Sequence, residues 1–131
     1  MTGYTLDAGA FIALERHDTF MMSVLLRGLT GGLALSIPQA VVAQIWRGGG
    51  GRQANLARLI KAGRFGVETV LIDDLTDDRA RQIGVAIGQT SHPDIADVHV
   101  ALLAAEQGHA VLTSDDADIA AVDPRLTIVH V

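Results

Sequence analysis

Three aspartates that lie far apart along the chain, Asp7, Asp97 and Asp115, have the residue type and setting for metal chemistry. Asp7 directly follows the β-rich segment YTL, and Asp115 follows the short segment AVLTS. Asp97 is embedded in the helical segment IADVHVALL, where an unpaired carboxylate is costly unless a cation or hydrogen bonds stabilise it. Hard divalent cations such as Mg²⁺ are held by a few carboxylates plus water, and these acids need not be adjacent in sequence. The three residues therefore predict a metal site.

The reaction that suits such a site is hydrolysis of a phosphodiester. Carboxylates held within a few ångströms of one another raise at least one pKa by like-charge repulsion, and a bound metal removes that conflict. The metal could then lower the pKa of a water, orient a phosphodiester and stabilise charge in an in-line displacement. The residue types are consistent with a nuclease site.

Each acid also has a structural interpretation. Asp94 follows a proline at a helix start and could complement the helix dipole. Asp115 or Asp116 could cap the short helix that follows, with Asp118 in its first turn, and for Asp116 alone capping is the favoured interpretation. Asp7, after a strand, could be a capping residue too. Two acids beyond strand ends and one acid beside the core together favour the metal.

Short β-rich segments alternate with helical patterns, and this order predicts an α/β fold with a parallel sheet covered by helices on both faces. The predicted strands are residues 4–6, 33–37, 66–72, 110–113 and 126–131. Helical patterns follow in AGAFIALER, in QAVVAQIWR after Pro38, in TDDRARQIGVAIG with Thr76 as its N-cap, and in PDIADVHVALLAAEQG, which Gly108 ends. Since ligands bind beyond the carboxyl ends of parallel strands, we expect Asp7 and Asp115 on the same rim.

The composition bounds the class of protein. The chain has 131 residues, of which 49% are hydrophobic, and we expect one folded domain over residues 1–131. Cysteine is absent, which excludes disulfides, thiolate zinc sites and cysteine nucleophiles. The five histidines show no zinc-like spacing, and for His92 a surface or capping role is favoured over substrate contact. No secretory signal, membrane span, Walker loop or nucleophile elbow is apparent, so we expect a soluble, cytoplasmic protein.

The charges are strongly segregated along the chain, although the formal net charge is only −5. The segment from Thr19 to Val67 contains no acid and six Arg or Lys, which makes +6. The remainder holds fifteen acids against four Lys or Arg, which makes −11. A basic segment could bind a polyanion while the acidic remainder holds cations, and a solvated helix face is the alternative interpretation.

An isolated amide, Gln44, lies within the basic segment, in an apolar run that ends at four consecutive glycines, residues 48–51. The glycines lack the Lys-Ser/Thr ending of a phosphate loop and follow a helical pattern. We expect them to end that helix and to allow a sharp reversal into RQANLARLIKAG.

The segments YTLDAGAFIAL, PQAVVAQIWRG, DIADVHVALLAAEQG and AVLTSDDADI together resemble the PIN domain family, in particular the VapC toxins of type II toxin–antitoxin pairs. The resemblance runs through nearly the whole chain in the expected order. It implies a three-layer α/β/α sandwich with a small central parallel sheet, and an acidic pocket that binds Mg²⁺ or Mn²⁺. It also implies endoribonuclease activity, a homodimer and a VapB-like antitoxin as partner.

The resemblance assigns roles to individual residues. Asp7 matches the family's first acid, Asp97 the acid on the long helix, and Asp115 the acid of a Thr-x-Asp motif in TSD. These three are the expected catalytic residues and metal ligands. Asp118 matches a further acid of the pocket, and the additional candidate ligands are Asp116, Asp94 and Gln44.

Two positions depart from the family pattern. A Ser, Thr or Asn usually stands two residues after the first Asp, where this chain has Gly9. The family's second acid, a Glu, falls on Gln44, which can offer a carbonyl oxygen but no negative charge. Affinity for Mg²⁺ should therefore be lower than in a four-acid site, unless Asp94, Asp116 or Asp118 compensates.

The leading functional hypothesis is a metal-dependent endoribonuclease of the VapC type, in which Arg47 and Arg52 contact RNA phosphates and cleavage leaves a 5′-phosphate. The alternative is a PIN-like module with little or no catalysis that binds RNA or a protein, and Gln44 and Gly9 favour it. A phosphotransfer enzyme or receiver is a third class. Its haloacid-dehalogenase-like version expects an acid where this chain has Gly9.

Overall fold

The computed structural model describes residues 2–48 and 51–131 and has the α/β architecture that the sequence predicts. Its sheet has five strands in the order β3-β2-β1-β4-β5, and every neighbouring pair is parallel. The strands are β1 (Gly3–Leu6), β2 (Ala34–Pro38), β3 (Val70–Asp73), β4 (Ala110–Thr113) and β5 (Ile128–His130). The strand order reverses direction at β1, which places the switch point of the sheet between β1 and β4.

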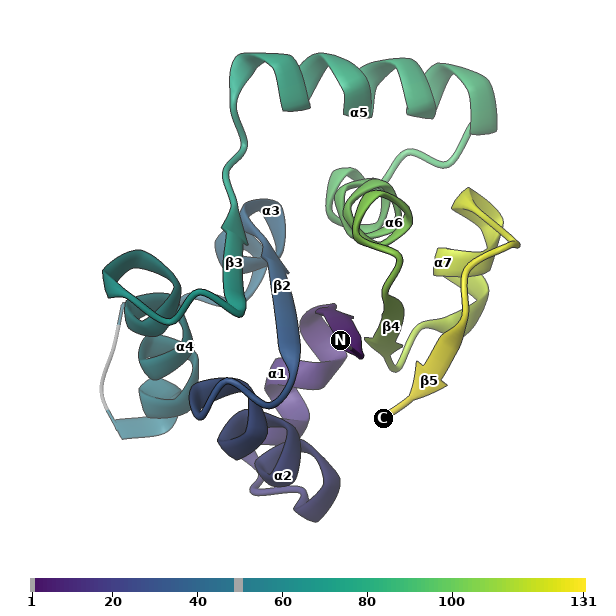
Figure 1. Cartoon of the computed structure of the whole chain (residues 1–131). Helices are drawn as coiled ribbons and strands as arrows, with labels where there is room; N and C mark the ends of the chain where they lie inside the picture. The colour runs from purple at the N-terminus through teal and green to yellow at the C-terminus, as the bar shows by residue number, and fades with distance from the viewer. Residues whose placement is uncertain (1, 49–50) are drawn as a thin grey trace.

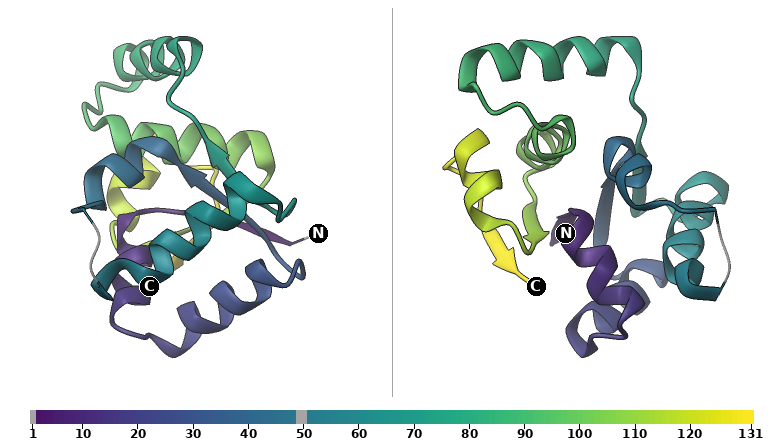
Figure 2. Two further views of the ribbon diagram at one scale, coloured as in Figure 1. Left: turned by 90° about the vertical axis from the view of Figure 1, so that its left-hand side faces the viewer. Right: turned by 180° about the vertical axis from the view of Figure 1, so that it is seen from behind.

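Helices cover both faces of the sheet, which gives three layers (Figures 1 and 2). They are α1 (Ala8–Glu15), α2 (Thr19–Leu29), α3 (Gln39–Ile45), α4 (Ala54–Phe65), α5 (Asp77–Thr90), α6 (Ile95–Gln107) and α7 (Asp116–Val122), with a short 3₁₀ turn, η1 (Gly51–Gln53). Helices α1, α2 and α4 lie on one face, while α6 packs on β1, β2 and β4 across the other face. Helix α5 lies outside α6.

The core is built from strands that are buried on both faces. Leu6, Leu35, Ile37 and Leu112 have no exposed surface, as expected for a parallel sheet between two helical layers. Helix α6 is buried along most of its length because it lies between the sheet and α5. Its first turn is therefore held rigidly at the carboxyl edge of the sheet.

The local signals explain several helix ends. Thr76 caps α5, and its side chain accepts a hydrogen bond from the backbone N–H of Arg79. Gly108 ends α6 in the left-handed conformation, with φ of 67°. The predicted strands and these two helix ends are confirmed in type. Strand β3, however, begins at Val70 because Gly66 ends α4 and residues 67–69 form a turn.

One helix was missed in the sequence prediction, and another was predicted too long. Helix α2 was not predicted, and α3 ends at Ile45, before the glycines. The side chain of Gln53 ends α3: its amide donates to the carbonyl of Ile45 at 2.7 Å and accepts from the N–H of Arg47 at 3.0 Å. Of the four glycines, residues 49 and 50 lie outside the described residues, so the predicted reversal there is not described. No helix within the described ranges is long and apolar enough to cross a membrane.

Candidate metal centre

The topology collects acids at the carboxyl edge of the sheet. Strands β1 and β4 are neighbours in register, with Leu6 opposite Leu112, so Asp7 and Asp115 emerge beside each other. Helix α6 leads into β4 through a short turn and runs back across the sheet, which places its first turn, with Asp97, at the same edge. Asp7, Asp97 and Asp115 therefore lie at one edge of the sheet, which is the common rim expected from the sequence.

Asp7 is almost completely buried, with 2% of its surface exposed. One carboxylate oxygen accepts from the backbone N–H of Ala8 at 2.8 Å, and the other accepts from the hydroxyl of Thr113 at 2.7 Å. The same Thr113 oxygen accepts from the N–H of Asp115 at 2.9 Å. Asp7 is therefore the N-cap of α1 and is also fixed in orientation toward the rim. Burial raises its pKa, and the nearby charges of Asp115 and Asp94 add to that rise.

Asp97 is the second buried acid, with 7% of its surface exposed. Its carboxylate lies 2.8 Å from Nε2 of His92, and its backbone N–H donates to Asp94, the N-cap of α6, at 2.8 Å. Burial raises the pKa of Asp97, and the charges of Asp94, Asp7 and Asp118 act in the same direction, while His92 opposes it. Burial is thus the main cause of both raised pKa values, and the neighbouring carboxylates add a smaller contribution in the same direction.

One group of side chains has the spacing of metal ligands. Within residues 2–48 and 51–131, one group of at least three potential ligands has donor atoms that all lie within 4.8 Å of one another. It consists of His92, Asp97 and Asp118. Asp118 was expected there, whereas His92 was not. The signal that could have found it is its place in the loop just before the helix that carries Asp97.

The remaining candidate ligands have different settings. Asp94 and Asp115 are N-cap residues at the rim, and Asp115 makes no side-chain capping bond. Asp116 turns to a different partner, because its carboxylate bonds Nδ1 of His130 at 2.8 Å. The charges of Asp94 and Asp115 act on Asp7, and Asp94 also acts on Asp97, whereas Asp116 bonds a residue of β5. Neither Asp7 nor Asp115 belongs to the group formed by His92, Asp97 and Asp118.

Gln44 is exposed and lines a cavity of about 560 Å³ that reaches the rim at Asp115. Glu15, Arg47 and Arg52 line the same cavity, as does Gln53, so the lining includes two acids, two amides and two guanidinium groups. The two arginines that the sequence singled out thus lie beside the acidic rim. A phosphate-bearing chain bound in this cavity would extend from Arg47 and Arg52 toward the carboxylates.

Steric crowding explains why position 9 is a glycine. A Cβ at this position would lie 2.2 Å from the hydroxyl oxygen of Ser114 and 2.8 Å from its backbone nitrogen. Helix α1 therefore approaches the loop after β4 too closely for any side chain. The hydroxyl of Ser114 occupies the space that a Ser or Thr at position 9 would need, so the departure at Gly9 accompanies a close backbone contact.

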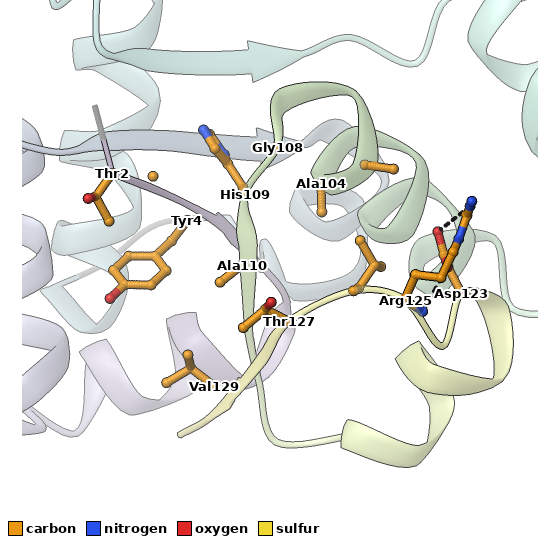
Figure 3. A pocket seen from close by; sticks show the side chains of 13 residues that line it. Thr2, Tyr4, Ala104, Gly108, His109, Ala110, Asp123, Arg125, Thr127 and Val129 are labelled. Atoms are coloured by element: carbon orange, nitrogen blue, oxygen red, sulfur yellow. Dashed lines mark hydrogen bonds and ion pairs between the residues drawn. The ribbon is translucent and has the colours of Figure 1, made fainter.

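A cavity of about 870 Å³ lies at the opposite edge of the sheet (Figure 3). It is lined by residues at the amino ends of β1 and β4, including Tyr4 and His109. Its one acid, Asp123, is paired with Arg125 at 3.0 Å. This cavity has no cluster of acids, so the candidate chemistry lies at the carboxyl rim.

The acidic rim fits a divalent cation. Among the ion pairs of the described residues, none joins a Lys or Arg to Asp7, Asp97 or Asp118. The donors are carboxylate oxygens, which suit both Mg²⁺ and Mn²⁺, and one imidazole nitrogen, which suits transition metals. Burial raises the pKa of both Asp7 and Asp97, so both carboxylates would gain from a cation at the rim.

The fold is of the PIN-like α/β type. A chain in the crystal structure described as VapBC2 from Rickettsia felis bound to a DNA fragment from their promoter is similar, with a TM-score of 0.64. The similarity covers 98% of this chain and 98% of that chain, at 14% sequence identity. No protein-family model and no curated protein matches the sequence. The likeness is therefore one of fold.

Proposed function

We propose that the protein is a metal-dependent endoribonuclease of the VapC type, the toxin of a type II toxin–antitoxin pair. The observation that carries this proposal is the set of buried and rim aspartates, without a Lys or Arg partner among the described residues, at the switch point of a PIN-like sheet. The fold alone is not sufficient, because one fold can host unrelated functions.

Asp7, Asp97 and Asp115 would hold Mg²⁺ or Mn²⁺, with support from Asp118. When bound, the cation would lower the pKa of a water and neutralise charge on the scissile phosphodiester. The protein's own contribution is positioning. Thr113 fixes the carboxylate of Asp7, and burial of the first turn of α6 fixes Asp97.

Arg47 and Arg52 would bind RNA phosphates on the far side of the same cavity. Their contribution should weaken as the salt concentration rises, because phosphate contacts release counterions. Gln44, which lines the same cavity, would donate its amide hydrogens to a phosphate oxygen. The proposed product carries a 5′-phosphate.

A VapB-like antitoxin is the proposed partner, and the similar fold in a VapBC2 complex supports it. An acidic rim attracts cations of any kind, so a basic side chain of the antitoxin would compete with the metal. A homodimer and a cytoplasmic location belong to the same proposal.

The test is cleavage of an RNA pool by the purified protein with Mg²⁺ or Mn²⁺. Asp7→Asn and Asp97→Asn should each lower cleavage at least about 100-fold. The matched control is Asp77→Asn, which removes an exposed acid from the first turn of α5. Cleavage that survives both rim substitutions would contradict the assignment.

A second candidate function is binding without catalysis, which Gln44 favours because a neutral amide stands where the family has an acid. If the wild type does not cleave RNA and Gln44→Glu does, the result supports this second function. If the wild type already cleaves RNA well, it fails.

A further inference from the structure

His92 lies where a metal ligand would lie, although its sequence context does not indicate one. Its Nε2 is 2.8 Å from the carboxylate of Asp97, and 15% of its side chain is exposed. Two neighbouring ligands of an octahedral ion, each about 2.1 Å from the metal, are about 3 Å apart. The separation of these two donor atoms is therefore compatible with one shared ion, and Asp118 supplies a third donor atom within 4.8 Å.

The loop that carries His92 is constrained on both sides. Ser91 ends α5 in the left-handed conformation, with φ of 60°, which is uncommon for a residue other than glycine. Pro93 follows and restricts the backbone of His92 to extended conformations. The backbone N–H of His92 donates to the hydroxyl of Thr90 at 3.3 Å. The imidazole is thus presented to Asp97 by a defined turn.

The neutral imidazole of His92 can carry its proton on either ring nitrogen, and the metal-free and metal-bound states would use different tautomers. An ionised carboxylate only accepts, so opposite an ionised Asp97 the proton would be on Nε2, which lies 2.8 Å from the carboxylate. Among the described residues, Nδ1 of His92 makes no hydrogen bond, so it is available to carry the proton instead. With the proton on Nδ1, the lone pair of Nε2 would face the space between Asp97 and Asp118.

We propose that His92 is a nitrogen ligand of the metal at the rim, and that it gives the site a preference for Mn²⁺ over Mg²⁺. This inference rests on the metal site of the proposed function and goes beyond it by naming the donor that selects the ion. Carboxylate oxygens suit both ions, whereas imidazole nitrogen suits transition metals and is a poor ligand for Mg²⁺.

The test is pulsed electron paramagnetic resonance of the protein loaded with Mn²⁺ alone. A directly coordinated imidazole gives nitrogen modulation of the Mn²⁺ echo, which we expect in the wild type. His92→Gln should abolish the modulation, although glutamine can still donate a hydrogen bond to Asp97. The matched control is His130→Gln, which removes a histidine that also lies 2.8 Å from an aspartate but outside the ligand group.

Affinity gives a second readout. We expect His92→Gln to raise the Kd for Mn²⁺ about 10-fold to 100-fold, and the Kd for Mg²⁺ by no more than about threefold. Thermal unfolding of each variant without metal shows whether it is folded. Equal losses for both ions in a folded variant would overturn the selectivity.

The outcomes separate this inference from the proposed function. Nitrogen modulation that depends on His92, in a protein that cleaves no RNA, would support the ligand and contradict the nuclease. RNA cleavage with bound Mn²⁺ that shows no nitrogen modulation would contradict the ligand and support the nuclease. Failure of Mn²⁺ to bind would overturn the ligand.

Discussion

The two ends of helix α6 carry acidic clusters that differ in where their positive charge comes from. At the first turn, the rim cluster consists of Asp7, Asp97, Asp115 and Asp118, with His92 beside it. The arginine cluster consists of Glu106 in the last turn, Arg79, Asp73 and Gln82 around it, and His99 from the second turn, which bonds Asp73. Both lie against the same helix, so their differences come from their partners.

The arginine cluster is neutralised by the protein itself. The guanidinium of Arg79 contacts Asp73 at 2.9 Å and Glu106 at 2.7 Å. It holds the pKa of Glu106 below its usual range. Burial lowers the pKa of His99, whose Nε2–H donates to Asp73 at 2.6 Å. This cluster fastens α5 and β3 to α6 and needs no ligand.

Within the part of the chain that the structure describes, no Lys or Arg forms an ion pair with an acid of the rim cluster, and burial raises the pKa of both Asp7 and Asp97. The helix dipole of α6 favours acids at its first turn, but this effect is worth only about 0.3–1 kcal/mol at a surface. Retaining buried carboxylates in this state costs stability unless an ion binds. The comparison teaches that one end of α6 holds the fold and the other end is prepared for a ligand.

The largest expected effect on stability is at the arginine cluster. Arg79→Met leaves Asp73 and Glu106 without their counter-charge, and should lower the free energy of unfolding by about 3 kcal/mol. We take the lower end of the usual range because the side chain of Glu106 is 49% exposed. Urea unfolding measures the change. Arg81→Met, at an exposed pair on the same helix, is the control and should stay within about 0.5 kcal/mol.

At the rim, a neutral substitution should act in the opposite direction. Without divalent metal, Asp97→Asn should raise the free energy of unfolding by about 1 kcal/mol, because it removes a buried charge that no Lys or Arg neutralises. Added Mn²⁺ should then stabilise the wild type and leave this variant unchanged. Urea unfolding with and without Mn²⁺ measures both effects. A variant less stable than the wild type in the absence of metal would show that the carboxylate serves the fold.

Acid should weaken the arginine cluster. Because the pKa of Glu106 in the folded protein lies below its ordinary value of 4.5, its contribution is present above pH 4.5 and is lost as the pH falls through the lowered pKa. Glu106→Gln should therefore show a smaller loss of stability than the wild type between neutral pH and about pH 3. Unfolding curves across this range measure it. Parallel pH profiles for the two proteins would remove Glu106 from the account.

The smallest expected effect on stability is at Asp116, which follows Asp115 in the sequence but bonds His130. This pair is exposed, so Asp116→Asn should change stability by less than about 0.5 kcal/mol. It should also leave the response to Mn²⁺ intact. If this variant loses the Mn²⁺ response, the rim cluster extends to Asp116.

The sequence predicts the fold where the signal is local. Buried β-rich segments and the helix ends at Thr76 and Gly108 can be recognised from neighbouring residues alone. The end of α3 could not be predicted, because it depends on the side chain of Gln53, eight residues beyond Ile45. A contact of that kind exists only in the folded chain.

The candidate site follows the same division. The positions of Asp7, Asp97 and Asp115 follow from the rule that ligands bind at the carboxyl edge of a parallel sheet. The sequence places His92 just before the helix that carries Asp97, but its approach to that carboxylate depends on the left-handed conformation of Ser91. The residue types alone do not specify that conformation.

The most direct test of the account is a calorimetric titration of Mn²⁺ into the wild type, Asp97→Asn and Glu106→Gln. The two variants each remove one carboxylate from opposite ends of α6. The account predicts saturable binding to the wild type and to Glu106→Gln, and its loss in Asp97→Asn. Equal binding to all three proteins, or loss in Glu106→Gln alone, would contradict it.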